Sequence, residues 1–265
     1  MGLSRKRSRS SAVVRLIFVY SALELWRNKF GLLLLVVIPA LFLAVTVWTA
    51  GEGEIPIKLF LQAGTQNLML SQRDISLIFM SAAVNGFLAA YYASLLFQRD
   101  FEYYRYCVSM GPKPTAFAVA RFCFLVSIVL FLAGLVTAIV SGFTTLERPL
   151  VALAGYVLLG VVYGAYGGIV GLLNRNHMVA VLLVVLLANL DAGWLQNPVF
   201  YSSAQEDSLI RWLPAFHPCQ LAFSAAFASE SNGRAALLAA GYGLSLFGAL
   251  IILVYLKLRR VARGP

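Results

Sequence analysis

The chain has 265 residues, of which 60% are hydrophobic, and its mean hydropathy of +0.81 is far above that of soluble domains. Its net charge of +10 could indicate a nucleic-acid-binding protein, but the basic residues cluster beside apolar segments, where they would face anionic lipid headgroups. We therefore expect no nucleic-acid partner. Apolar segments and the loops between them occupy nearly the whole sequence, which leaves no room for a soluble catalytic domain.

Each of six apolar segments is long enough to cross a bilayer as a helix. They lie near residues 30–49, 75–98, 115–142, 150–173, 177–196 and 236–256. With the N-terminus in the cytoplasm, 16 of the 21 Lys and Arg residues fall inside and 5 outside, whereas 3 of the 11 acids fall inside and 8 outside. Because an excess of Lys and Arg marks cytoplasmic loops, we predict a multi-pass protein of the inner (plasma) membrane with both termini in the cytoplasm.

These features predict an all-α integral membrane fold. A single six-helix transmembrane domain would cover residues 30–258, between basic cytoplasmic tails at 1–29 and 259–265. The first apolar run is interpreted as a retained span, because cleavage as a signal peptide near Ala50 would leave a leader much longer than usual.

Residues 12–29 are apolar but too short, and too interrupted by charge, to cross the membrane. On a helical wheel one side is apolar, and it consists of Phe18, Val19, Ala22, Leu23, Leu25 and Trp26. This pattern is typical of an amphipathic helix that lies in the inner interface of the membrane, and a cytoplasmic extension of the first span is the alternative. The loop at 50–74 begins with Gly51, Glu52, Gly53, Glu54 and Pro56, which argue against continued helix.

A compact charged and aromatic stretch follows the second span. It contains Arg99, Asp100, Glu102, Tyr103, Tyr104, Arg105 and Tyr106. Gly111, Pro112 and Pro114 end any helix there, because proline lacks a donor and clashes with the preceding turn. The sequence predicts a short cytoplasmic helix over about 99–113, and an interfacial loop with its tyrosines at headgroup depth is the alternative.

The fourth apolar segment carries Gly160, Gly164 and Gly168 at steps of four residues. Lipid supplies no hydrophobic drive for association between helices, and small residues at this spacing let helix backbones approach one another. We expect these three glycines to form a helix-packing face.

The segment at about 209–230, before the last span, is rich in apolar residues but is broken by two prolines. Its longest uninterrupted run, residues 219–228, would reach only about 15 Å as a helix and cannot span the membrane. We predict an extracytoplasmic re-entrant segment that enters the outer leaflet and turns back, and a plain surface loop is the alternative. Its candidate residues are Trp212, Pro214, Phe216, His217 and Pro218.

Motifs for known chemistry are missing from the sequence. It contains no Gly-x-x-x-x-Gly-Lys-Ser/Thr phosphate loop, no His-Glu-x-x-His pair, no Gly-x-Ser-x-Gly elbow and no Cys-x-x-Cys. His217 and Cys219 could in principle ligate a metal, but two ligands without a third make a weak case. We therefore expect no catalytic residue, metal or cofactor on this chain.

Two polar residues, Asn85 and Asp191, lie near or within apolar segments. Ionisable groups inside a membrane are costly and are functional by default, so these two are candidates for a polar pathway. A structural role is the alternative, because Asp191 is next to Gly193 and Trp194 at the expected outer boundary of its span, where that cost fades. The three cysteines, Cys107, Cys123 and Cys219, fall in different compartments of the predicted topology, which excludes a disulfide framework.

Taken together, these features resemble the permease subunits of type-2 ABC exporters. The stretch from Arg99 to Pro114 is similar to the cytoplasmic coupling helix of that family, and residues 213–218 are similar to its segment before the last span. Ile38-Pro39 in the first span also fits. The three tyrosines of the charged stretch depart from the family, which more often has Gly, Thr and Leu there.

The resemblance implies that two permease copies form a translocation path in the lipid bilayer. A separate ATPase subunit would bind ATP and Mg and engage the coupling helix, and spans one and five would contribute to the homodimer interface. The main alternative is a non-transporting membrane-embedded protein that acts in assembly, partner binding or immunity. A membrane enzyme is a third possibility, which the missing catalytic sets of residues disfavour.

Overall fold

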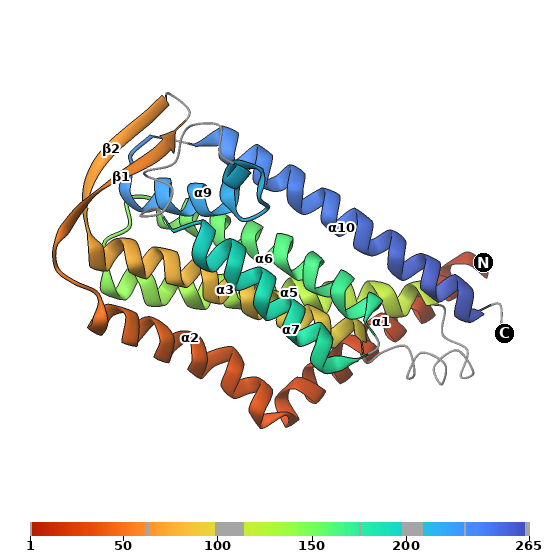
Figure 1. Cartoon of the computed structure of the whole chain (residues 1–265). Coiled ribbons are helices and arrows are strands. Elements are labelled where there is room, and N and C mark those ends of the chain that lie inside the picture. Colours follow the sequence, from red (N-terminus) through yellow and green to blue (C-terminus); the bar gives the residue numbers. More distant parts are fainter. Residues whose placement is uncertain are drawn as a thin grey trace.

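The computed structural model describes residues 2–61, 64–98, 114–174, 176–197, 209–230 and 232–262. Its helices form an elongated bundle, with a β-hairpin over one end and both chain termini at the other (Figure 1). We call these two ends the hairpin end and the terminal end.

Six helices among the described residues are long and apolar enough to cross a membrane, as predicted. They are α2 (Lys29–Thr49), α3 (Gln72–Gln98), α5 (Pro114–Phe143), α6 (Pro149–Leu173), α7 (His177–Ala188) with its π-helical continuation η1 (Asn189–Leu195), and α10 (Gly233–Ala262). Their apolar stretches agree with the predicted limits to within about three residues at each end. The chain thus has the architecture of a multi-pass helical membrane protein.

The loop predicted at 50–74 contains a β-hairpin, which corrects the all-α expectation. β1 (Glu54–Leu61) pairs antiparallel with β2 (Gly64–Ser71). In β1 the side chains of Ile57 and Leu59 are buried, and the residues between and beside them are more exposed. This period of two, which the sequence carries, is the physical reason for a strand whose one face packs on the bundle. Gly64 has a φ of +135°, a conformation that favours glycine.

The N-terminal helix α1 (Gly2–Arg27) is longer than predicted and meets α2 at a sharp bend (Figure 1). Asn28 forms this joint, and its Oδ1 accepts a hydrogen bond from the backbone N–H of Gly31 at 3.1 Å, which caps α2. The ring of Phe18 packs edge-on against that of Phe124 in α5, with 5.6 Å between centroids. Other residues of the predicted apolar face remain exposed, namely Val19, Leu23 and Trp26. The interfacial position of this helix stays a prediction.

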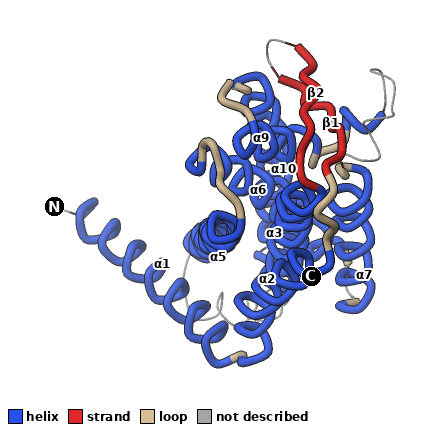
Figure 2. The backbone as a smooth tube through the Cα atoms, turned by 90° about the vertical axis from the view of Figure 1, so that its left-hand side faces the viewer, coloured by secondary structure: helices blue, strands red, loops and turns tan. Residues whose placement is uncertain are grey.

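Helices α3 and α6 form the centre of the bundle. Most residues in their apolar stretches are buried, whereas fewer than a third are buried in α2, α7 and α10. Figure 2 shows α5 on one side of α3 and α7 on the other, with α2 also next to α3. The outer helices therefore present apolar faces that must meet lipid or another subunit.

The three glycines predicted to pack α6 are all buried. A Cβ atom added at Gly160 would lie 2.7 Å from Cγ1 of Val129, and one added at Gly168 would lie 2.8 Å from Cδ2 of Leu250. At Gly164 the nearest atom would be 3.5 Å away, which is an ordinary contact distance. These positions therefore differ in how strictly they require glycine.

The tightest approach between helix backbones lies at two other glycines of α6. A Cβ atom at Gly167 would lie 2.0 Å from the carbonyl oxygen of Ala90, and one at Gly171 would lie 2.4 Å from that of Ser94. Both oxygens belong to the backbone of α3 and cannot move aside as a side chain can. Gly167 and Gly171, four residues apart, are thus the small-residue pair that brings the two central helices together.

Candidate functional site

The segment before the last span packs along the first half of α6. The backbone N–H of Arg148, at the start of α6, donates to the carbonyl of Ala225 near the end of α9 (Phe216–Phe227) at 2.9 Å. Further along α6, a Cβ atom at Gly155 would lie 2.9 Å from the backbone nitrogen of Ala222. Helix α9 therefore runs antiparallel to α6, from the interior of the bundle back to the hairpin end.

The residues predicted for the re-entrant segment lie around the start of α9. The short 3₁₀ helix η2 (Leu209–Trp212) exposes Trp212, and Pro214 follows in the turn to α9. Phe216 is buried and His217 is half-buried, while Pro218 fits the first helical turn because no backbone donor is needed there. The depth of this segment in a bilayer stays a prediction.

The side chain of Asp191, in the π-helical turn η1, connects three parts of the chain at the inner end of α9. Its Oδ2 accepts hydrogen bonds from the hydroxyl of Tyr163 on α6 and from the backbone N–H of Ala215 at 3.1 Å. Its Oδ1 accepts one from Nε2 of Gln196 at 2.9 Å. A buried carboxyl group is tolerated only when its oxygens are satisfied in this way. The network therefore fixes the start of α9 against α6 and the fifth apolar helix.

The second polar candidate, Asn85, is buried in α3. Its Nδ2 donates to the backbone carbonyl of Tyr156 on α6 at 2.7 Å, and the hydroxyl of Tyr156 hydrogen-bonds that of Ser81 at 2.5 Å. Asn85 and Asp191 thus bind α6 through tyrosines seven residues apart, which places the two tyrosines on one side of that helix. The structure brings both candidates to α6 but gives them different partners.

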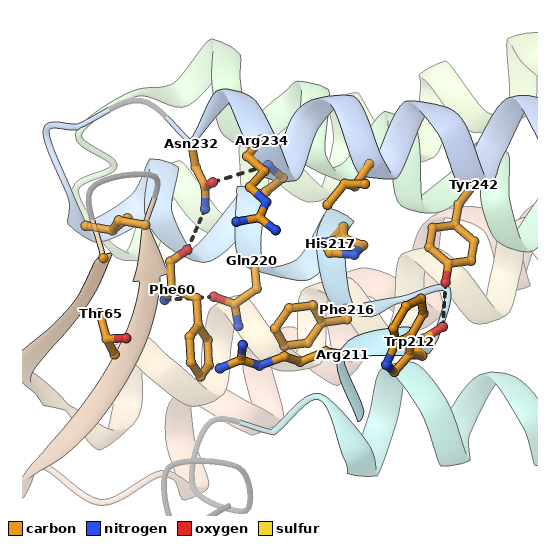
Figure 3. Close-up of a pocket in the computed structure, with 14 residues that line it drawn as sticks. Phe60, Thr65, Arg211, Trp212, Phe216, His217, Gln220, Asn232, Arg234 and Tyr242 are labelled. Carbon is orange, nitrogen blue, oxygen red and sulfur yellow. Dashed lines mark hydrogen bonds between the residues drawn. The ribbon is translucent and has the colours of Figure 1, made fainter. Parts of the chain in front are cut away.

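A cavity of about 580 Å³ lies at the hairpin end, between the hairpin, η2, α9 and α10 (Figure 3). Its wall contains Arg211, Arg234 and His217, and the described residues that line it include no Asp or Glu. The guanidinium of Arg211 lies over the ring of Phe60, with 4.4 Å between Cζ and the ring centroid. We call this basic and aromatic cavity the hairpin pocket.

Hydrogen bonds between distant segments hold the walls of the hairpin pocket. Nδ2 of Asn232 donates to the carbonyl of Phe60 at 2.8 Å, and its Oδ1 accepts from the backbone N–H of Ala235 at 3.3 Å. The hydroxyl of Tyr242 donates to the carbonyl of Trp212 at 2.7 Å. Because these bonds join the hairpin to α10 and α10 to η2, tertiary contacts determine the shape of the pocket.

The two residues considered for metal binding have different environments. Burial, and to a lesser extent the positive charge of Arg234, lowers the pKa of His217 below its ordinary value of 6.5. Burial raises the pKa of the Cys219 thiol above its ordinary value. Among the described residues, no group of three or more His, Cys, Asp or Glu side chains could hold a metal ion.

The residues predicted to couple to an ATPase lie outside the described residues; they are Arg99, Asp100, Glu102, Tyr103, Tyr104, Arg105 and Tyr106. The stretch begins directly after Gln98, the last residue of α3. Nε2 of Gln98 donates to the carbonyl of Asn174 at 3.1 Å, and its Oε1 lies 2.9 Å from Nδ1 of His177. The ends of α3 and α6 and the start of α7 are thus joined next to this stretch, at the terminal end.

No protein-family model matches this chain, and no curated protein was found to be similar to it.

Sequence reasoning missed several residues of these sites, namely Tyr156, Tyr163, Gln196, Arg211, Asn232 and Arg234. One signal was available for the tyrosines, because a hydroxyl within an apolar helix needs a hydrogen-bond partner and thus marks a polar contact. Arg211 and Arg234 lie in separate segments, and no local pattern links them.

Proposed function

We propose that this chain is the transmembrane permease subunit of an ATP-driven exporter of the type-2 ABC class. Two copies would form the translocation path, and a separate ATPase subunit would bind ATP and Mg²⁺. Closure of the ATPases would switch the path between inward-open and outward-open states. In this proposal the chain supplies a path and a lever, and the chemistry takes place on its partner.

The path of residues 209–230 relative to α6 is the observation that carries the proposal. Ten of the 12 residues of α9 are buried, and Asp191 holds the inner end of this helix. Interrupted backbone at membrane depth is tolerated only when it is buried against protein or lines a water-filled cavity. A buried helix that begins inside the bundle and ends at the hairpin end supports the predicted re-entrant segment, which the family resemblance places before the last span.

The charge distribution supports the orientation that such a permease needs. With the terminal end in the cytoplasm, the charged stretch at 99–113 would lie where a soluble ATPase can reach it, and 16 of the 21 Lys and Arg residues would lie on that side. The hairpin and the hairpin pocket would then lie on the opposite side.

The exposed faces of α2 and α7 support a homodimer. Both helices contact α3, as Figure 2 shows, and both expose large apolar side chains, such as Leu41 and Trp48 on α2 and Leu182 on α7. A second copy that covered these faces would place spans one and five at the interface, as the family resemblance implies.

The test is purification of the full chain from its native membrane, followed by identification of co-purifying proteins by mass spectrometry. We expect an ATPase that carries the phosphate-binding loop. In a Glu102→Arg/Tyr104→Ala variant the ATPase should be lost, or its hydrolysis should no longer drive transport, because charged and aromatic side chains dominate docking energetics. Glu147→Arg, a charge reversal at the hairpin end, is the matched control and should retain the ATPase.

Two outcomes would contradict the proposal. Normal ATPase association and normal transport in the double variant would show that residues 99–113 do not couple the ATPase to the permease. If no ATPase accompanies the chain, the membrane-embedded assembly or immunity protein becomes the better interpretation.

A further inference from the structure

We propose that the hairpin pocket binds the phosphate-bearing headgroup of an anionic amphiphile. This inference goes beyond the proposed function, because it requires neither an ATPase nor transport. It rests on the charge of the pocket, on the order of polar and apolar groups along it, and on the contacts that preform it.

The hairpin pocket is positively charged. Arg211 and Arg234 both line it, no described lining residue is acidic, and Arg234 is exposed and so accessible to a ligand. In Figure 3 the two arginine side chains point toward Gln220 from opposite sides of the pocket. A planar guanidinium donates paired hydrogen bonds to phosphate oxygens, so two such groups around one space favour a phosphate group over a neutral ligand.

The lining residues on α10 change from charged to apolar along the helix. The apolar stretch of α10 begins at Gly233, so Arg234 is its second residue. Leu238 and Tyr242 lie one and two turns further into this stretch, on the same side of the helix. Eight residues of helix correspond to about 12 Å. The pocket is therefore charged where the span begins and apolar and aromatic further in, which matches a ligand with a charged head and an apolar chain.

Contacts within the protein preform the hairpin pocket. Phe60, which carries the guanidinium of Arg211 on its ring, is itself held by Asn232 through its carbonyl and by Gln220 through its backbone N–H, which lies 3.4 Å from Oε1. Trp212 is held in turn by the hydroxyl of Tyr242. A site whose walls are already ordered loses little entropy on binding, and the guanidinium of Arg211 is held on the Phe60 ring before an anion arrives.

The experiment titrates the purified full chain, in a non-ionic detergent, with dioctanoyl phosphatidylglycerol, and uses native mass spectrometry to count bound lipid. Dioctanoyl phosphatidylcholine and inorganic phosphate are the two comparison probes. We expect the anionic lipid to bind at least about tenfold more tightly than either, because the first probe has no net negative charge and the second has no apolar part.

Arg211→Gln/Arg234→Gln should weaken binding of the anionic lipid by about a hundredfold, since each of the two lost charged hydrogen bonds corresponds to about tenfold. Lys58→Gln/Arg73→Gln is the matched control, because it removes two charges at the same end of the bundle from residues that do not line the pocket. The control should bind as the unmodified chain does. Arg234→Gln alone keeps the packing of Arg211 on Phe60, so it tests the charge without loosening the pocket.

Three results would overturn the proposal. The first is equal binding of the two lipids, which would show that the pocket does not recognise an anionic headgroup. The second is inorganic phosphate that competes with the anionic lipid at equal concentration, which would identify a free anion as the ligand. The third is binding of the anionic lipid that survives both Arg234→Gln and the double variant, which would place the lipid elsewhere.

Discussion

The hydroxyl of Tyr163 donates a hydrogen bond to Oδ2 of Asp191, and this bond joins the middle of α6 to the end of the fifth apolar helix. The same oxygen accepts the backbone N–H of Ala215, the residue before α9. One carboxyl group thus positions three segments that meet inside the bundle. In the proposed permease, a change at this junction would move the segment before the last span relative to α6.

Asp191→Ala should destabilise the protein strongly. It leaves the hydroxyl of Tyr163, Nε2 of Gln196 and the N–H of Ala215 without their acceptor, and each buried unsatisfied group costs about 1–3 kcal/mol. The apparent unfolding midpoint in detergent should fall by about 10 °C. Tyr163→Phe removes one of three donors and should lower it by only a few degrees.

Glu147→Ala, which removes an exposed acid at the hairpin end, is the control for this comparison and should leave the midpoint nearly unchanged. An Asp191→Ala protein as stable as the control would contradict the role given to the network.

The glycines of α6 should differ sharply in their tolerance of alanine. Gly167→Ala would place Cβ 2.0 Å from the carbonyl oxygen of Ala90, so α3 and α6 must separate, at a cost of about 3 kcal/mol or more. Gly164→Ala meets its nearest atom at 3.5 Å and should be neutral or stabilising by up to about 1 kcal/mol, because alanine favours helix. Yield and unfolding midpoint of the two variants measure this difference. Equal losses in both would show that the helices can adjust at either position.

Stability should fall in acid because of His217. Its pKa in the folded protein lies below the ordinary 6.5, through burial and the charge of Arg234, so the unfolded chain takes up the proton more readily as the pH falls. Arg211 from η2 and Tyr242 from α10 also face the pocket. None of the described residues that line it is acidic, so none offers a negative charge that would stabilise protonated His217. The unfolding midpoint should therefore decrease between pH 7.5 and 5.5, and His217→Gln should reduce that decrease.

The matched control for this measurement is His177→Gln. It removes the second histidine of the chain, which lies at the terminal end and far from the hairpin pocket. A decrease with pH that is the same in His217→Gln as in the control would contradict the assignment to His217.

The predicted orientation can be tested by labelling in intact cells. In a background with the native cysteines replaced, a cysteine introduced at Thr65 of the hairpin should react with an impermeant maleimide, and one introduced at Ser8 should not. The reason is that the excess of Lys and Arg predicts a cytoplasmic terminal end, and Figure 1 shows the hairpin at the opposite end. Labelling at Ser8 together with protection at Thr65 would show that the orientation is the reverse of the predicted one.

Local patterns predicted much of the fold. The six apolar helices end within about three residues of the predicted limits, because the length and hydropathy of one segment decide whether that segment can span a membrane. The hairpin is the exception: Gly51, Gly53 and Pro56 disfavour helix but do not by themselves indicate a strand, although β1 carries a period-two pattern. The coupling stretch at 99–113 and the orientation remain predictions.

The sequence by itself determined where the helices lie along the chain, which residues disfavour helix, and that Asn85 and Asp191 are the polar groups to examine. Only the tertiary structure decided which partners these side chains meet, and that Gly167 and Gly171 are the positions where two backbones touch. It alone brought Arg211 and Arg234 to one pocket. The physical reason is that such contacts depend on the rotation and axial register of packed helices, which join residues far apart in the chain. Local spacing places several glycines of α6 at steps of four, but it does not say which of them face α3.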